Sequence, residues 1–445
     1  MSQAEQIADE KPYWLKGNLA PVMEEVTSFD LPVEGAIPKE LRGLYARNGA
    51  NPKEGHSGHW FFGDGMIHGV SLKDGKAEWY RNRWVRTPRY EGKPRTSPID
   101  IRNGVANTNV FAHAGKIMAL VETALPTMLS RDLETIGMHD YDGKLDTPFT
   151  AHPKICPVTG ELHFFGYRFM PPFLTYHMVD KAGQLKQSVP IPVKAATMVH
   201  DFAMTSGHIV FMDLPVVFDM ALGMKGTMPF AWSESYGARL GILPRGKGAD
   251  ALRWVEIDPC YVYHVANAFE EADGTIVVDV AWYPEHWRNG PSSTSFDRAH
   301  LRRWRVPPGA TKAQEQSLDD RTIEFPRVND HLAGLRHDIV YAVDGGNSDI
   351  ATADYSTVRK YDLRTGKSTA HAFENGLPSE FVHVPGEDGK AEDDGWLMGF
   401  VYDRARDASD LVILDAQKIE SKPVARIKLP KRVPQGFHGN WMPDA

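Results

Sequence analysis

The sequence predicts an all-β fold, and three observations carry this prediction. Short apolar or alternating stretches, such as 207–213 and 275–281, recur along the 445 residues. Turn signals ending in glycine separate such stretches, and glycine supplies the positive φ that tight hairpins need. Long helical periods are few. Together these features indicate a sandwich, barrel or propeller, and no strict repeat gives a blade count. The eight turn signals are Asp74-Gly75, Ala114-Gly115, Asp142-Gly143, Thr159-Gly160, Ala182-Gly183, Ser206-Gly207, Asp273-Gly274 and Thr365-Gly366.

The composition suits one soluble globular domain that spans residues 1–445. Hydrophobic residues make up 42% and charged residues 24%, and proline and glycine are spread evenly without a linker. A net charge of −8 without a basic run gives no footprint for nucleic acid. Only two cysteines, no secretory signal and no apolar run of roughly 18 residues predict a cytoplasmic protein.

Two segments depart from the β pattern. Residues 1–27 are expected to form an irregular lead-in. Residues 215–232 are rich in Met, Phe and Trp and carry few charges, which indicates a short helix and loop at one end of the fold. One interpretation is a connection that covers the core. The other is an apolar lip at an entrance that contacts membranes at their periphery.

The stretch from 150 to 165 predicts a strand, a turn at Thr159-Gly160 and a second apolar strand, with His152 at the mouth of the hairpin. Three further histidines, His200, His264 and His438, also have apolar or small neighbours, where an imidazole needs a strong partner. Successive members of this set are 48, 64 and 174 residues apart. A closed ring of sheets could bring them together, whereas one helix or loop could not.

Four imidazoles suit Fe, Zn, Cu or Ni, and spacing alone does not choose among these metals. Zinc enzymes more often use three protein ligands and a water. Four neutral imidazoles around an octahedral ion leave two positions open, which favours a ferrous ion that handles dioxygen. Metal-bound histidines usually donate their second N–H to an acceptor. Glu122, Glu324 and Glu380, each in an apolar setting, are candidates, and an ordinary strand-end carboxylate is the alternative for each.

These residues resemble those of the carotenoid cleavage oxygenase family, which includes apocarotenoid oxygenases, stilbene-cleaving dioxygenases and the retinoid isomerase of the visual cycle. The resemblance covers nearly the whole chain in an ordered set of short motifs. They are Asn18-Leu-Ala-Pro-Val22, Pro38-Lys-Glu-Leu-Arg-Gly43, Phe62-Gly-Asp-Gly-Met66, Ala106-Asn-Thr-Asn109, Ala151-His-Pro-Lys154, His200-Asp201, His264-Val-Ala-Asn-Ala-Phe-Glu270, Glu324-Phe-Pro326, Glu392-Asp-Asp-Gly395 and Phe437-His-Gly439.

The resemblance implies a seven-bladed β-propeller with a helical and loop cap over its metal face. It also implies one Fe(II) per chain, held by His152, His200, His264 and His438, with Glu122, Glu324 and Glu380 orienting three of these histidines. The implied reaction is cleavage of a conjugated C=C bond by O₂ into two carbonyl products, without an organic cofactor.

The expected substrate is an apolar conjugated molecule, an apocarotenoid or similar polyene. Relatives that act on phenols carry a lysine just before the first of the three glutamates, and Val121 stands at that position. Aromatic residues near the motifs are candidates for substrate contact, with packing between blades as the alternative: Phe62, Phe173, Tyr263 and Trp282, beside Val121 itself.

Three other functions remain open: cleavage of stilbenes or phenylpropenoids, isomerohydrolysis of a retinyl-ester-like substrate, and non-enzymatic binding through the rim of the ring. The complete set of histidines and glutamates argues against pure binding, since a binding module has no use for it. The oligomeric state is not readable from the sequence.

Overall fold

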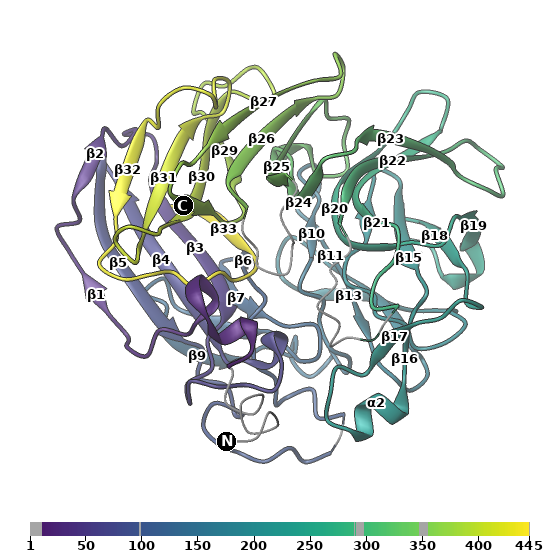
Figure 1. Ribbon diagram of the computed structural model, residues 1–445. Helices are drawn as coiled ribbons and strands as arrows, with labels where there is room; N and C mark the ends of the chain where they lie inside the picture. Colours follow the sequence, from purple (N-terminus) through teal and green to yellow (C-terminus); the bar gives the residue numbers. More distant parts are fainter. Residues whose placement is uncertain (1–10, 98, 289, 291–297, 347–354, 445) are drawn as a thin grey trace, which may run out of the picture.

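The computed structural model describes residues 11–97, 99–288, 290, 298–346 and 355–444. Seven antiparallel sheets follow one another around the molecule, from the purple N-terminal strands to the yellow C-terminal strands beside them (Figure 1). This arrangement confirms the all-β class and the seven-bladed propeller. We number the blades 1 to 7 in the order in which their first strands occur after residue 108.

Blades 1 to 5 are each built from four strands. Blade 1 consists of β6 (Asn109–His113), β7 (Lys116–Leu120), β8 (Thr127–Leu129) and β9 (Thr135–Met138). Blade 2 consists of β10 (Lys154–Ile155), β11 (Leu162–Tyr167), β12 (Leu174–Val179) and β13 (Leu185–Ile191). Blade 3 consists of β14 (Ala203–Met204), β15 (His208–Asp213), β18 (Ala238–Pro244) and β19 (Arg253–Ile257). Blade 4 consists of β20 (Tyr261–Glu270), β21 (Ile276–Tyr283), β22 (His300–Val306) and β23 (Gln314–Asp319). Blade 5 consists of β24 (Thr322–Arg327), β25 (Ile339–Gly346), β26 (Thr357–Asp362) and β27 (Lys367–Ala372).

Blades 6 and 7 combine strands from the two ends of the chain. Blade 6 consists of β28 (Gly376–Pro378), β29 (Val382–Pro385), β30 (Gly395–Asp403), β31 (Ala408–Asp415), β32 (Ala425–Lys428) and the N-terminal β2 (Val33–Gly35). Blade 7 consists of the C-terminal β33 (Gly439–Pro443) with β3 (Gly43–Ala50), β4 (Gly65–Lys73), β5 (Lys76–Trp84) and β1 (Thr27–Ser28). Because each end of the chain completes a sheet begun by the other, the ring is closed, and we infer that the chain is one domain.

Glycine turns join neighbouring strands, as the sequence predicts. Seven of the eight turn signals lie between antiparallel partners, and the eighth, Asp142-Gly143, lies in the connection between β9 and β10. The glycines take positive φ values, such as 78° at Gly75 and 84° at Gly274. Gly207 is different, because its φ is not positive and an added Cβ would lie 3.0 Å from Oε1 of Glu270.

The core fills the interfaces between blades. Successive residues of a strand point to opposite faces of its sheet, so one strand serves two interfaces. On β11, Phe164 packs towards blade 1, whereas Phe165 packs towards blade 3. Buried clusters of this kind occupy each interface around the ring, including that between blades 6 and 7.

The strand predicted from residue 150 pairs only over β10. Residues 150–153 run ahead of it, and Thr150 N donates to Phe165 O at 2.7 Å. Pro153 cannot donate a ladder hydrogen bond, so the sheet begins at Lys154 and the preceding residues turn His152 away from it.

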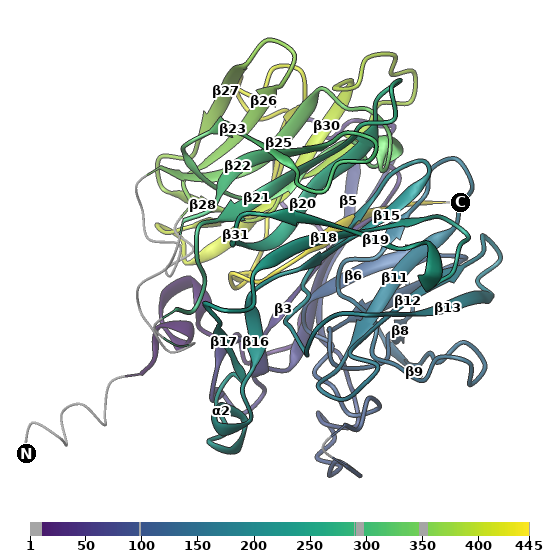
Figure 2. The same ribbon diagram turned by 90° about the vertical axis from the view of Figure 1, so that its right-hand side faces the viewer.

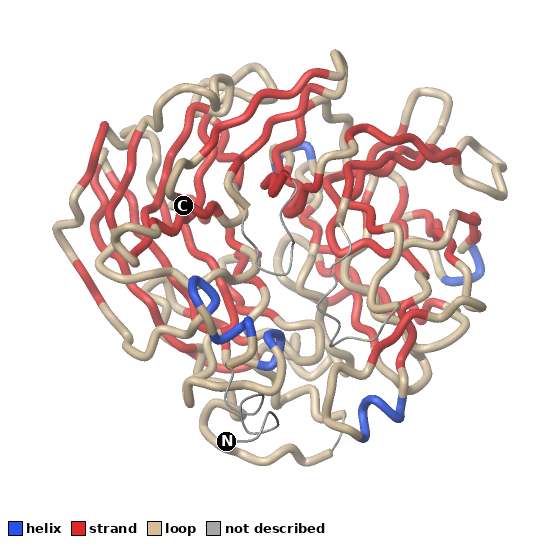
Figure 3. Tube along the Cα trace, viewed as in Figure 1, coloured by secondary structure: helices blue, strands red, loops and turns tan. Residues whose placement is uncertain are grey.

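A small cap protrudes from one end of the ring (Figure 2). Within the predicted 215–232 segment, β16 (Val216–Phe218) pairs with β17 (Phe230–Trp232) around the short helix α2 (Met220–Met224). Helices are rare in the described residues (Figure 3): the others are the 3₁₀ turns η1 (Tyr13–Leu15), η2 (Gly17–Leu19), η3 (Trp60–Phe62), η4 (Ala249–Ala251) and η5 (Asp330–Leu332). The lead-in prediction for residues 1–27 lies partly outside the described residues, and the described part holds η1 and η2. Among the described helices, none has the length and apolar character needed to cross a bilayer.

Candidate metal centre

Four histidines converge from four different blades. His152 lies just before β10 in blade 2, and His200 lies just before β14 in blade 3. His264 lies on β20 in blade 4, and His438 lies just before β33 in blade 7. One ring nitrogen from each lies within 4.8 Å of the other three. The closed ring therefore gathers residues that the sequence keeps far apart.

The three predicted glutamates come from the remaining three blades. Glu122 follows β7 in blade 1, Glu324 lies on β24 in blade 5, and Glu380 follows β28 in blade 6. Each carboxylate contacts Nδ1 of one histidine: Glu122 that of His200, Glu324 that of His264, and Glu380 that of His438 at 3.1 Å. Each of the seven blades thus supplies one member of this cluster.

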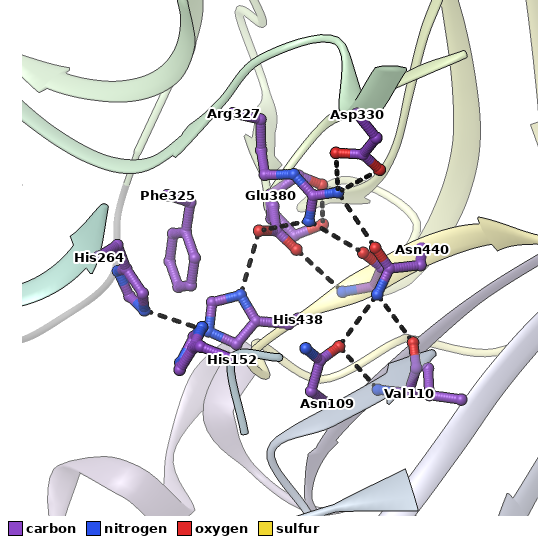
Figure 4. Close-up of polar contacts among 12 residues, drawn as sticks. Asn109, Val110, His152, His264, Phe325, Arg327, Asp330, Glu380, His438 and Asn440 are labelled. Atoms are coloured by element: carbon purple, nitrogen blue, oxygen red, sulfur yellow. Dashed lines mark hydrogen bonds and ion pairs between the residues drawn. The ribbon is translucent and has the colours of Figure 1, made fainter. Parts of the chain in front are cut away.

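The Nε2 atoms face one another. Nε2 of His152 lies 3.0 Å from that of His200, and Nε2 of His264 lies 3.1 Å from that of His438. Two nitrogens in adjacent octahedral positions, each about 2.1 Å from an ion, would lie about 3.0 Å apart. Figure 4 shows His438 between Glu380 on one side and the imidazoles of His152 and His264 on the other. The spacing therefore fits adjacent positions around one ion.

Electrostatics favour a neutral His152 and an ionised Glu380, whereas His264 shares its proton with the carboxylate beside it. Burial, and then the neighbouring imidazoles, hold the pKa of His152 well below its ordinary value. Burial alone would lower the pKa of His264, but Glu324 outweighs it and the pKa of His264 is raised. Burial would raise the pKa of Glu380, but His438 and Arg327 outweigh it and lower this pKa to about 2.

The histidine cluster opens on a cavity of about 1220 Å³. This exceeds the roughly 300–1,000 Å³ of pockets for drug-sized ligands, so the cavity has room for a larger substrate. His200, His264 and His438 form part of its wall, while β16 and β17 of the cap contribute Phe218 and Phe230. Further aromatic lining comes from Trp60, Phe61, Phe62, Phe169, Trp287 and Tyr355.

The five residues predicted to contact substrate divide into two groups. Phe62, Val121 and Tyr263 line the cavity, and Val121 is buried against Val105 and Ala124. Phe173 and Trp282 do not line it, which corrects the expectation from their positions near the motifs.

Their place in the sheets explains the correction. Tyr283 lines the cavity from β21, so its neighbour Trp282 points to the opposite face, under the guanidinium of Arg302 at 4.0 Å. At the turn before β12, Phe173 O accepts a hydrogen bond from Arg168 N, and Phe169 lines the cavity instead. Phe169 stacks on Phe218 of the cap at 5.1 Å.

Several residues that line or support the site were not predicted from the sequence. Phe325 lines the cavity and stacks on His264 with ring centroids 5.1 Å apart. Its φ of 50° is rare for a bulky residue and aims it differently from a regular strand residue. Tyr167 donates to Glu122 and Tyr283 donates to Glu324, each at 2.6 Å. Only Phe325 had a signal in the sequence, because it lies within the Glu324-Phe-Pro326 motif.

Known proteins resemble this chain over its whole length. A family model described as retinal pigment epithelial membrane protein matches residues 19–443. A carotenoid cleavage oxygenase of Mycobacterium tuberculosis is 40% identical, with 100% of each chain covered. A carotenoid 9,10(9',10')-cleavage dioxygenase of Phaseolus vulgaris is 35% identical, with 97% of this chain and 90% of that protein covered.

Solved structures show the same fold. The lignostilbene dioxygenase of Pseudomonas brassicacearum superposes with a TM-score of 0.88 at 28% identity, covering 98% of this chain and 99% of that one. The cobalt-substituted apocarotenoid oxygenase of Synechocystis gives a TM-score of 0.86 at 27% identity, covering 97% of this chain and 98% of that one. These likenesses extend over the propeller and over the blades that carry the histidine cluster.

Proposed function

The chain belongs to the carotenoid cleavage oxygenase family and is an alkene-cleaving dioxygenase, and we propose that it uses one Fe(II), bound by His152, His200, His264 and His438, to cleave a conjugated polyene. The products would be two carbonyl compounds, and an apocarotenoid is the substrate class we favour. The observation that carries the proposal is that four buried or carboxylate-oriented imidazoles meet at a cavity of about 1220 Å³ with many aromatic residues in its wall.

The donor set fits a divalent transition metal. Four Nε2 atoms face inward, and three of the Nδ1 atoms are held by carboxylates, which fixes ring orientation. Imidazole donors suit Fe, Cu, Ni and Zn, and a set of four leaves two octahedral positions free. The similar Synechocystis oxygenase has a cobalt-substituted form, which supports a bound metal in this fold.

When bound, a ferrous ion would supply the redox chemistry that allows O₂ to react with an alkene. The residues of this chain would position that alkene beside the histidine cluster and exclude water from it. Phe325 and Tyr263 serve this purpose, because both line the cavity and their rings contact His264 and His200. No side chain is needed as a general acid or base, so Glu122, Glu324 and Glu380 act by holding imidazoles.

The wall beside Glu122 supports an apolar substrate. Val121, Val105 and Ala124 form a buried apolar cluster there, and Val121 lines the cavity. These three residues offer no cation to a phenolate, and an unpaired buried charge is costly. A polyene has no such requirement.

Entry of an apolar substrate from a membrane surface is part of this proposal. The cap lines the cavity through Phe218, Met228 and Phe230, while Met220 and Met224 of α2 are 59% and 83% exposed. Exposed methionines beside an apolar cavity would allow peripheral contact where the substrate enters.

Stilbene cleavage is the second candidate. It is favoured by the likeness to the Pseudomonas brassicacearum lignostilbene dioxygenase and by a polar pair in the cavity wall. In that pair the Tyr263 hydroxyl lies 2.7 Å from Nε2 of His286, and it could meet a phenol of the substrate.

The deciding experiment measures metal in anaerobically purified protein and then compares an apocarotenal with resveratrol under air. About one iron per chain, as one four-histidine site requires, with aldehydes formed from the apocarotenal, would support the proposal. Aldehydes from resveratrol alone would favour the second candidate. Absence of iron, or bound zinc without turnover, would overturn the iron assignment.

A further inference from the structure

One of the four histidines lacks the support that the other three have. Glu122, Glu324 and Glu380 hold three imidazoles, but among the described residues no carboxylate contacts His152. Ligands of a metal site need fixed orientation, and outer partners usually provide it. Apart from packing against the other three imidazoles, the orientation of His152 therefore depends on its backbone and on what holds that backbone.

A buried amide holds the backbone immediately before His152. Nδ2 of Asn109, on β6, donates to the carbonyl oxygen of Ala151 at 2.7 Å. Asn109 is 7% exposed, and its Oδ1 accepts from Val110 N at 2.8 Å, which fixes which end of the amide faces Ala151. The carbonyl of the residue before His152 is thus tied to blade 1.

The same amide is linked to His438 through three further side chains. Oδ1 of Asn109 accepts from Nδ2 of Asn440 at 3.1 Å, and Oδ1 of Asn440 accepts from Nη2 of Arg327 at 3.1 Å. Nη1 of Arg327 donates to Oε1 of Glu380 at 3.3 Å, the same oxygen that lies 3.1 Å from Nδ1 of His438. Figure 4 shows this continuous path from His438 to Asn109.

The path crosses five neighbouring blades. Arg327 belongs to blade 5, Glu380 to blade 6, Asn440 to blade 7, Asn109 to blade 1 and Ala151 to blade 2. It therefore spans the point at which the two ends of the chain close the ring. Arg327 can serve several acceptors at once because its guanidinium is a rigid fork, and it also donates to Asp330 at 3.1 Å.

We propose that Arg327, Asn440 and Asn109 form a positioning network that fixes His152 relative to His438, and so stands in for the missing fourth carboxylate. The inference rests on the proposed metal function. The network acts through Glu380 at one end and the Ala151 carbonyl at the other, and none of its three members contacts the histidine nitrogens that face inward. The alternative is a network that only closes the ring mechanically.

Titration of the metal-free full-length protein with Co(II), followed by its visible ligand-field absorption, separates these possibilities. Asn109→Ala and Arg327→Met should each weaken Co(II) binding about 10- to 100-fold and alter the absorption bands, as loss of outer partners does. Because both residues act through one path, the fold loss of Co(II) affinity in the double variant should be smaller than the product of the two single fold losses. Arg327→Lys keeps a cation but not the planar guanidinium fork, so its Co(II) affinity should lie between those of wild type and Arg327→Met.

Matched variants control for the loss of a buried polar contact elsewhere. Arg239 pairs with Asp213 in blade 3 and is as buried as Arg327. The side chain of Asn82, on β5 in blade 7, makes two partly buried hydrogen bonds with the backbone of Glu24 and Val26. Arg239→Met and Asn82→Ala should lower the melting temperature but leave Co(II) affinity and absorption unchanged.

Two results would overturn the inference. The first is that Asn109→Ala and Arg327→Met show the same Co(II) affinity and absorption as the controls Arg239→Met and Asn82→Ala. The second is that the loss of Co(II) affinity in the double variant equals the product of the two single losses. If wild-type protein bound neither Fe(II) nor Co(II), the proposed function itself would fail, and that outcome is distinct because it appears before any substitution.

Discussion

Tyr283 donates a 2.6 Å hydrogen bond to Oε1 of Glu324, both buried, one blade apart. Oε2 of Glu324 contacts Nδ1 of His264. The phenol therefore restrains the carboxylate that restrains the imidazole, and Tyr167 stands in the same relation to Glu122 and His200. Around the cluster, three of the four histidines are held by carboxylates, and these carboxylates are held by a third set of side chains.

Removing Tyr283's hydroxyl tests this third set. We expect Tyr283→Phe to weaken metal binding by about 1 kcal/mol, roughly fivefold, because one hydrogen bond to the carboxylate is lost. Metal affinity by equilibrium dialysis is the measurement. Tyr236→Phe is the matched control, since Tyr236 donates at 2.7 Å to Asp213, outside the cluster. Equal affinities in both variants would contradict the role of Tyr283.

Loss of one histidine should empty the site. We expect His264→Ala to lower iron from about one per chain to under roughly a tenth, and to abolish cleavage, since three ligands remain for a six-position ion. Elemental analysis and product assay check this. His300→Ala should retain iron, because His300 lies on β22, outside the cluster, with its Nδ1 3.4 Å from Arg321 O. Full activity and iron in His264→Ala would refute the ligand assignment.

Glu380 should matter for the metal more than for the fold. We expect Glu380→Ala to weaken iron binding about 10- to 100-fold while circular dichroism stays unchanged, since His438 loses its orienting acceptor. Iron retention and kcat are the measurements. Wild-type values for both would show that His438 needs no carboxylate.

Acid should destabilise the metal-free protein partly through Glu380. Its pKa falls from an ordinary 4.5 to about 2 on folding. As the pH falls below about 4.5, Glu380 becomes protonated in the unfolded chain, whereas in the folded chain it stays ionised until about pH 2. The contribution of Glu380 to the free energy of unfolding is therefore complete above pH 4.5 and is lost as the pH falls towards 2. Melting temperature measured over this window should fall less steeply in Glu380→Gln. Parallel curves for the two proteins would contradict the lowered pKa.

Val121 should set the preference between polyenes and phenols. We expect Val121→Lys to reduce kcat/KM for an apocarotenal at least about tenfold, because a buried cation replaces an apolar wall, and to raise turnover of resveratrol. Val121→Met, which stays apolar, should change the ratio of the two substrates little. An unchanged ratio in Val121→Lys would mean that this wall does not meet the polar end of a substrate.

The sequence determined the strands, the turns and the identity of the clustered residues. Alternation and glycine turns are local properties, so hairpins such as that at Asp74-Gly75 were readable without knowledge of the fold. His152, His200, His264 and His438 stood out because their neighbours are apolar, and the ordered motifs identified their family.

Only the tertiary structure decided which side chains meet. Trp282 and Tyr283 are adjacent in sequence, and the pleat of β21 sends only Tyr283 to the cavity. Arg327, Asn440 and Asn109 are ordinary polar residues in the sequence, and closure of the ring between blades 5 and 1 joins them into one path. Such contacts depend on the packing of whole blades against one another, a long-range property that no local pattern of residues encodes.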